Sequence, residues 1–171
     1  MLAALTRTFN LLLAPAFLDP VDSPHSSVYQ CAPLDPKARP LSLLHFQGRP
    51  LLFVHGPAPP SSDSLSALRS SSPDLHVFFT PNFQNVASKP AEPQLLDEPS
   101  SSSEEMTLLH ERDVTGPETS TLYRFLRRHA PSFDLQVGHA PRLRTPGGAF
   151  LCDRYGQVVA QADSVDELLE N

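Results

Sequence analysis

The sequence predicts an α/β domain with a central sheet flanked by helices. Two short apolar runs, residues 51–54 and 75–79, lack polar alternation, which is typical of strands covered on both faces. A helical pattern lies between them, and the last third of the chain adds a helix, a hairpin and a final helix. With 171 residues, 40% of them hydrophobic, the chain is long enough for one domain with its own core.

The segment ahead of the first apolar run is expected to hold a further strand. Residues 26–35 (SSVYQCAPLD) contain a β-favouring run, and Pro33 ends it. A short apolar patch follows at 41–46, and Gly48 separates this patch from the strand at 51–54.

A short helix is expected directly after the strand at 51–54. Ser61 or Ser62 can cap a helix that begins at Asp63, because a serine oxygen accepts a hydrogen bond from the free N–H groups of a first turn. The SSSP run at 70–73 ends the helix. Its apolar positions are Leu65 and Leu68.

The middle of the chain, after the strand at 75–79, has little periodicity. Residues 80–103 are rich in proline, serine and glutamine, and 84–103 are expected to form a long Pro/Ser-rich loop. The chain has 19 prolines, which cluster between residues 55 and 100 and favour irregular backbone there.

The last third of the chain is expected to be better ordered. A helix starts after a cap at Thr119 or Ser120 and stops at Pro131. Residues 148–161 (GAFLCDRYGQVVAQ) predict a hairpin with Arg-Tyr-Gly at its turn, and 163–171 (DSVDELLEN) predict a capped helix. The first helix carries Leu122, Phe125 and Leu126 at i, i+3 and i+4, and the last helix is expected to bury Val165, Leu168 and Leu169. This order of elements is typical of a thioredoxin-like layout.

Composition and spacing exclude several kinds of site. The net charge is −6 with no Lys/Arg-rich block, so we expect no nucleic-acid partner. Cys31 and Cys152 lack the close spacing of a redox pair or a zinc site, and each is expected to be a small buried hydrophobe. Phosphate-binding loops, paired carboxylates and metal-ligand clusters are absent from the sequence, so no cofactor and no metal are predicted.

Residues 1–25 are expected to be an apolar, amphipathic extension of a domain at 26–171. Leucines and Phe9 recur at helical spacing before Pro15, over a stretch too short to span a bilayer. The extension fits a mitochondrial targeting peptide, a secretory signal or a retained helix that lies on a partner. Arg7 lies inside the apolar stretch, which disfavours a secretory signal. We expect a retained helix and a mitochondrial location, with the cytoplasm as the alternative.

Several segments resemble the glutathione peroxidase family. SSVYQCAPLDPKARPLSLLHFQGRPLLFV is similar to its opening hairpin and first core strand, and VFFTPNFQN to its second core strand. ERDVTGPETSTLYRFLRRHAP is similar to the family's Asp-Val-Asn-Gly-Pro turn and the helix that follows, and FLCDRYGQVV to its last strand pair. The resemblance covers residues 26–171 in the family's order, and it implies a thioredoxin-like, glutathione peroxidase-like fold.

The resemblance also implies where a catalytic site would stand. In the family, a cysteine or selenocysteine after the first core strand attacks peroxide as the thiolate or selenolate. The positive end of the following helix and the glutamine, tryptophan and asparagine hydrogen-bond donors lower its pKa. Here that position falls at Pro60, and Thr145 and Pro146 replace the Trp-Asn pair. Gln84 stands near the expected glutamine, and the chain contains no tryptophan. We therefore expect a degenerate member without catalytic residues.

The remaining candidates are poor substitutes for a thiolate in that loop. Cys31 is expected in the first strand and Cys152 in a core strand, both away from the loop. Ser61 and Ser62 carry alcohols, which do not reduce a peroxide. His55 ends the strand at a position where open α/β sheets place functional residues, but no acidic partner is evident nearby, so we expect a structural role.

The family's helix after the SSEEM segment is almost absent, because MTLLHERDV follows at once. We expect the helix after residue 105 to be largely deleted, which leaves apolar sheet surface for another element to cover. Residues 1–17 and 84–109 are expected to contact other protein subunits, with membrane contact at most peripheral.

Two functions are compatible with these features. The chain is expected to be a non-catalytic accessory subunit of a larger protein assembly, such as a respiratory complex of the mitochondrial inner membrane. The sequence does not distinguish this role from that of a stand-alone chaperone or regulator with the same fold. The alternative is a divergent thiol peroxidase or redox sensor that uses Cys152 or Cys31. The missing nucleophile favours a pseudoenzyme.

Overall fold

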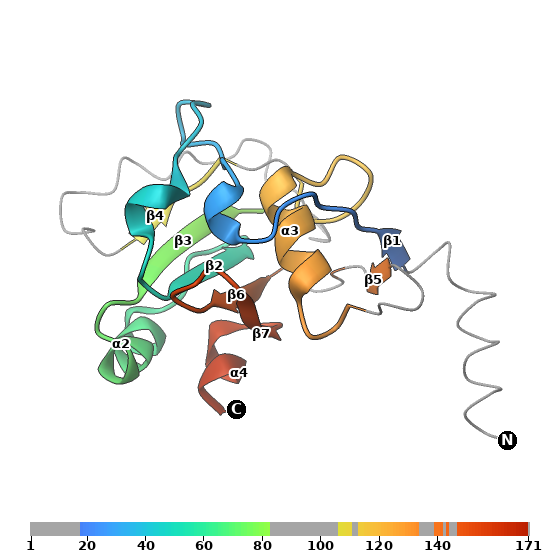
Figure 1. Ribbon diagram of the computed structural model, residues 1–171. Helices are drawn as coiled ribbons and strands as arrows, with labels where there is room; N and C mark the ends of the chain where they lie inside the picture. Colours follow the sequence, from blue (N-terminus) through green and yellow to red (C-terminus); the bar gives the residue numbers. More distant parts are fainter. Residues whose placement is uncertain are drawn as a thin grey trace, which may run out of the picture.

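A five-stranded sheet forms the centre of the molecule (Figure 1), within the part of the chain that the computed structural model describes. That part comprises residues 18–82, 106–110, 113–133, 139–141, 143 and 147–170. The strand order is β4–β3–β2–β6–β7; β2, β3 and β4 run parallel, whereas β6 and β7 are antiparallel to their neighbours. The strands are β2 (Leu51–Gly56), β3 (His76–Pro81), β4 (Met106–Leu108), β6 (Gly148–Cys152) and β7 (Val158–Ala162).

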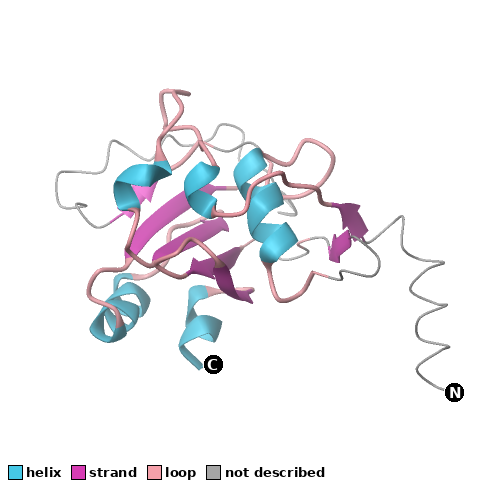
Figure 2. Ribbon diagram, viewed as in Figure 1, coloured by secondary structure: helices cyan, strands magenta, loops and turns pink. Residues whose placement is uncertain are grey.

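Helices cover both faces of this sheet (Figure 2). One face packs against α3 (Thr121–His129) and two 3-10 helices, η1 (Val28–Gln30) and η2 (Leu43–Phe46). The other face packs against α2 (Ser62–Ser71) and α4 (Val165–Glu170). Because successive side chains of a strand point to opposite faces, β2 contributes Leu51 and Phe53 to the first layer and Leu52 and Val54 to the second. This double coverage explains the unbroken apolar runs of the central strands.

The predicted helices begin where their caps lie. The Ser61 Oγ accepts a hydrogen bond from the Ser64 N–H at 3.1 Å, and the Ser120 Oγ accepts one from the Tyr123 N–H at 3.4 Å. The apolar positions of α3 are all buried; of the two leucines that α2 was expected to bury, Leu65 is buried and Leu68 is half-buried. The helix predictions for α2 and α3 and the hairpin of β6 and β7 are therefore confirmed.

The expected strand at 26–35 is wrong, because this segment contains η1 instead. The Val28 N–H donates to the Gly156 carbonyl oxygen at 3.0 Å, which binds the segment to the distant β6–β7 turn rather than to a neighbouring strand. Tyr29 is buried, and its hydroxyl donates to the Arg154 carbonyl oxygen at 2.9 Å.

The opening hairpin expected from the resemblance is reduced to one isolated bridge between Leu34 and Pro40. Proline has no N–H to donate to a ladder, so a proline at 33, 36 and 40 limits how far strands can pair here. In the C-terminal helix, Val165 is buried as expected, whereas Leu169 is 40% exposed, contrary to the prediction that it is buried. Leu168 is half-buried, and Leu169, about 100° further around the helix axis, points away from it toward the solvent.

A short antiparallel pair lies beside the main sheet, formed by β1 (Leu18–Pro20) and β5 (His139–Pro141). The expected N-terminal helix in residues 1–17 and the whole expected Pro/Ser-rich loop at 84–103 lie outside the described residues. Between residues 106 and 120, the described positions contain no helix, in line with the expected loss of the helix after residue 105. Among the helices that the structure describes, none combines the length and apolar character needed to cross a bilayer.

Candidate functional site

The loop after β2 lies at the carboxyl end of the central parallel strands, where open α/β sheets bind ligands. It leads from Gly56 to the start of α2, and a cavity of about 220 Å³ lies next to it. Three segments line this cavity: residues 54–64, the glycine pair at 147–148 and residues 163–166 ahead of and in α4. Pro60, which the sequence resemblance places at the nucleophile position, is among the lining residues.

The side chains of this loop offer no nucleophile. Proline at position 60 has no reactive group. The Ser61 and Ser64 hydroxyl oxygens lie 2.6 Å apart, and the Ser64 hydroxyl donates to Asp166 Oδ1 at 2.5 Å. Ser61 thus caps α2, and Ser64 joins α2 to α4 through its hydrogen bond to Asp166. The Asp166 carboxylate is the group that accepts from Ser64, whereas activation of a serine nucleophile ordinarily uses a stronger base such as a histidine.

His55 does not supply that base. Its side chain is 2% exposed, and its ring meets the edge of the Tyr123 ring with centroids 5.4 Å apart. Neither ring nitrogen has a hydrogen-bond partner within the described part of the chain, so His55 does not contact a serine hydroxyl. Burial, together with the positive charge of Arg127, lowers the pKa of His55 to about 4, and the imidazole is neutral at pH 7.

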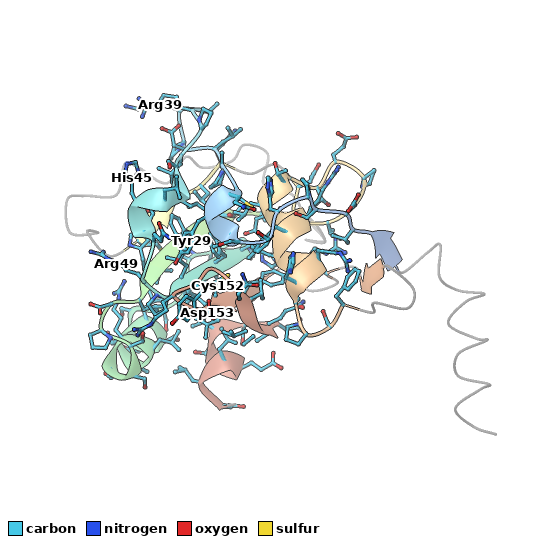
Figure 3. All side chains as sticks on the ribbon, viewed as in Figure 1. Tyr29, Arg39, His45, Arg49, Cys152 and Asp153 are labelled. Atoms are coloured by element: carbon cyan, nitrogen blue, oxygen red, sulfur yellow. The ribbon has the colours of Figure 1, made fainter. Side chains whose placement is uncertain are left out.

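Both cysteines lie in the core on the α3 side of the sheet. Cys31 is 2% exposed and Cys152 fully buried, and Cys152 lies toward the middle of the molecule with Tyr29 (Figure 3). Burial raises the pKa of the Cys152 thiol far above its ordinary value, and the nearby Asp153 and Cys31 raise it further. The thiolate that peroxide chemistry requires is therefore strongly disfavoured.

Cys152 also lies at the wrong end of the sheet. It pairs with Leu51, the first residue of β2, whereas the loop begins beyond Gly56, the last residue. At a rise of about 3.3 Å per residue, these two ends are roughly 16 Å apart. Cys152 therefore cannot replace a nucleophile in the loop.

The other family positions are not part of the described structure. Thr145, Pro146 and Gln84 lie outside the described residues. Gly147 and Gly148, which directly follow Pro146 in the sequence, form one wall of the cavity. Within the described ranges, no group of three or more His, Cys, Asp or Glu side chains is placed to hold a metal ion.

Two buried polar side chains near His55, those of Thr80 and Arg127, were not predicted from the sequence to belong to this region. Thr80 is fully buried and pairs with His55 across the β2–β3 ladder, and Arg127 is 2% exposed. Arg127 follows Tyr123 by four positions, so helical spacing places both on the buried face of α3. That spacing was the available signal for Arg127, whereas Thr80 required the register of two strands.

Comparisons with known proteins agree with this fold. No family model and no curated protein matches the sequence. The crystal structure of Trgpx in its apo form is 16% identical with a TM-score of 0.61, over 85% of this chain and 92% of that one. T. cruzi GPX1 is 17% identical with a TM-score of 0.52, over 85% and 93% of the two chains. These likenesses show the fold alone, and they confirm the predicted thioredoxin-like, glutathione peroxidase-like α/β class.

Proposed function

We propose that this chain is a non-catalytic protein on a glutathione peroxidase-like fold, which serves as an accessory subunit of a larger protein assembly. The observation that carries the proposal is the separation of the thiols from the loop. Pro60 occupies the expected nucleophile position, while Cys31 and Cys152 are buried in the core.

The alternative function, a thiol peroxidase or redox sensor that uses Cys152 or Cys31, requires an accessible thiolate. Burial of both side chains and the raised pKa of Cys152 oppose it.

The assembly would be held through surfaces outside the catalytic loop. Residues 1–17 carry an amphipathic leucine pattern, and residues 84–109 comprise the Pro/Ser-rich segment and the stretch in which we expect the family's helix to be largely deleted. We assign these two segments to contacts with other subunits, in a mitochondrial inner-membrane complex or, as the alternative, in a cytoplasmic one.

Peroxide turnover tests the absence of catalysis. The purified full-length chain should consume hydrogen peroxide no faster than a buffer control, with glutathione or with thioredoxin as reductant. A turnover that disappears in a Cys152→Ala or Cys31→Ala variant would overturn the proposal and support the thiol peroxidase. Thr119→Val, which leaves both thiols in place, is the matched control for loss of activity through misfolding.

A further inference from the structure

The strand β7 is the last strand on one side of the central sheet (Figure 1). Successive residues of an antiparallel strand direct their N–H and C=O groups alternately toward one neighbour and away from it. The ladder of β7 runs to β6, and its further hydrogen bond in the described structure joins the Ser132 hydroxyl to Gln161 Oε1 at 2.6 Å. The outer backbone edge of β7 therefore has no hydrogen-bond partner among the described residues.

This edge has little of the usual protection against pairing with another strand. Folded proteins protect their edges by short strands, prolines, charged side chains or bulges. β4, at the opposite edge, has only three residues, whereas β7 has five, VVAQA, with neither a proline nor a charged side chain. A bulge stands at Val159, whose side chain is 50% exposed, and residues 160–162 continue in regular register with β6. An open and uncharged edge remains beyond the bulge.

The charges at the two ends of β7 are opposite. Arg154, which is exposed, lies in the turn before the strand, and Asp163, also exposed, follows the strand directly. The carboxylate of Asp153 is occupied within the turn, where it accepts from the Tyr155 and Gln157 N–H groups at 2.9 Å each. An antiparallel copy of the strand would bring its acidic end toward Arg154, whereas a parallel copy would bring like charges together.

We propose that β7 pairs antiparallel with β7 of a second copy of this chain, so that two five-stranded sheets join into one continuous sheet. The pairing has a twofold axis, and each copy supplies the same donors and acceptors that it receives. Backbone hydrogen bonds between edge strands are an established mode of protein recognition. The inference does not depend on the absence of catalysis, because the loop after β2 contributes nothing to this edge.

Analytical ultracentrifugation of the full-length chain over a range of concentrations tests the pairing. The wild type should sediment as a dimer at high concentration and as a monomer on dilution. Val159→Lys, which places a charge on the edge, should shift the equilibrium to the monomer. Leu44→Lys is the matched control, because it adds the same charge at a side chain of η2 that is 60% exposed, and it should leave the dimer intact. A wild type that stays monomeric throughout, or a dimer that Val159→Lys leaves unchanged, would overturn the proposal.

Hydrogen exchange on the wild type locates the contact without relying on any variant. As the concentration rises and the dimer forms, the amides of residues 158–162 that point away from β6 should exchange more slowly, because they become hydrogen-bonded to the second copy. The amides of β4 should exchange at an unchanged rate. A dimer whose newly protected amides lie in β4 or in residues 1–17, with β7 unchanged, would overturn the assignment.

Discussion

His55 is the residue whose environment has the clearest consequence for stability. Its folded pKa is about 4, against 6.5 for an unperturbed histidine, because burial and the charge of Arg127 disfavour the imidazolium. Between these two pKa values, His55 is protonated in the unfolded chain and neutral in the folded chain. This contribution to stability is complete above about pH 6.5, declines as the pH falls, and is lost at about pH 4.

We predict that replacing His55 by leucine weakens the pH dependence of unfolding. At about 1.4 kcal/mol for each pKa unit, the wild type should lose up to roughly 3 kcal/mol between pH 7 and pH 4 through this group. Urea unfolding of both proteins at pH 7, 5.5 and 4.5 measures the difference. His76→Leu is the control, since His76 also has a pKa lowered to about 4 but is only half-buried and should contribute less. Parallel pH curves for the wild type and His55→Leu would contradict the assignment.

At the scale of elements, the β2–β6 ladder depends on a glycine. An added Cβ at Gly148 would lie 2.7 Å from His55 Cε1 and 3.3 Å from the Ala162 carbonyl oxygen, inside a packed core. At Gly147, the nearest atom is the His55 carbonyl oxygen at 3.3 Å. A methyl group would therefore have less room at Gly148 than at Gly147.

We predict that Gly148→Ala destabilises the fold by about 1–3 kcal/mol, because the ring must move in a close-packed interior. Gly147→Ala should lower the free energy of unfolding by clearly less than Gly148→Ala does. Thermal or urea unfolding of the two variants makes the comparison. In a His55→Ala background, most of the cost at position 148 should disappear, and equal costs in both backgrounds would show that the ring is not the cause.

The elements also show how far the sequence alone predicts this molecule. Apolar runs and caps are local signals, so the central strands, α2, α3 and the β6–β7 hairpin were predicted. The conformation of the segment 26–46 was not predicted, because it depends on hydrogen bonds from Val28 and Tyr29 to the distant turn of that hairpin. Likewise, burial of Cys152 followed from its core strand, whereas the His55–Thr80 pair depends on strand register, which no single segment encodes.

At the scale of the whole molecule, the described sheet is better covered than the loss of a helix suggested. The described large apolar side chains that are exposed lie outside β2, β3, β4 and β6: they are Leu44, Tyr155, Val159 and Leu169. Single exposed apolar residues of this kind are ordinary on the surfaces of folded proteins. The proposed subunit contacts therefore rest on residues 1–17 and 84–109.

We predict that deletion of residues 1–17 releases the protein from its native assembly and leaves the domain folded, because the five-stranded sheet and its covering helices lie within 18–170. Size-exclusion chromatography of tagged full-length and truncated chains from their native source measures this. The full-length chain should elute with other subunits and the truncated one as a smaller species. Co-elution of both with the same subunits would contradict a role for the segment.

The most direct test of the central claim, that this fold has no peroxide-reactive thiol, is the oxidation state of the two cysteines. The folded chain is exposed to hydrogen peroxide at neutral pH, and intact mass spectrometry follows Cys31 and Cys152, with urea-unfolded protein as the reactive control. We predict that both thiols stay reduced in the folded chain and react once it is unfolded. Rapid formation of a sulfenic acid or a disulfide in the folded chain would contradict it.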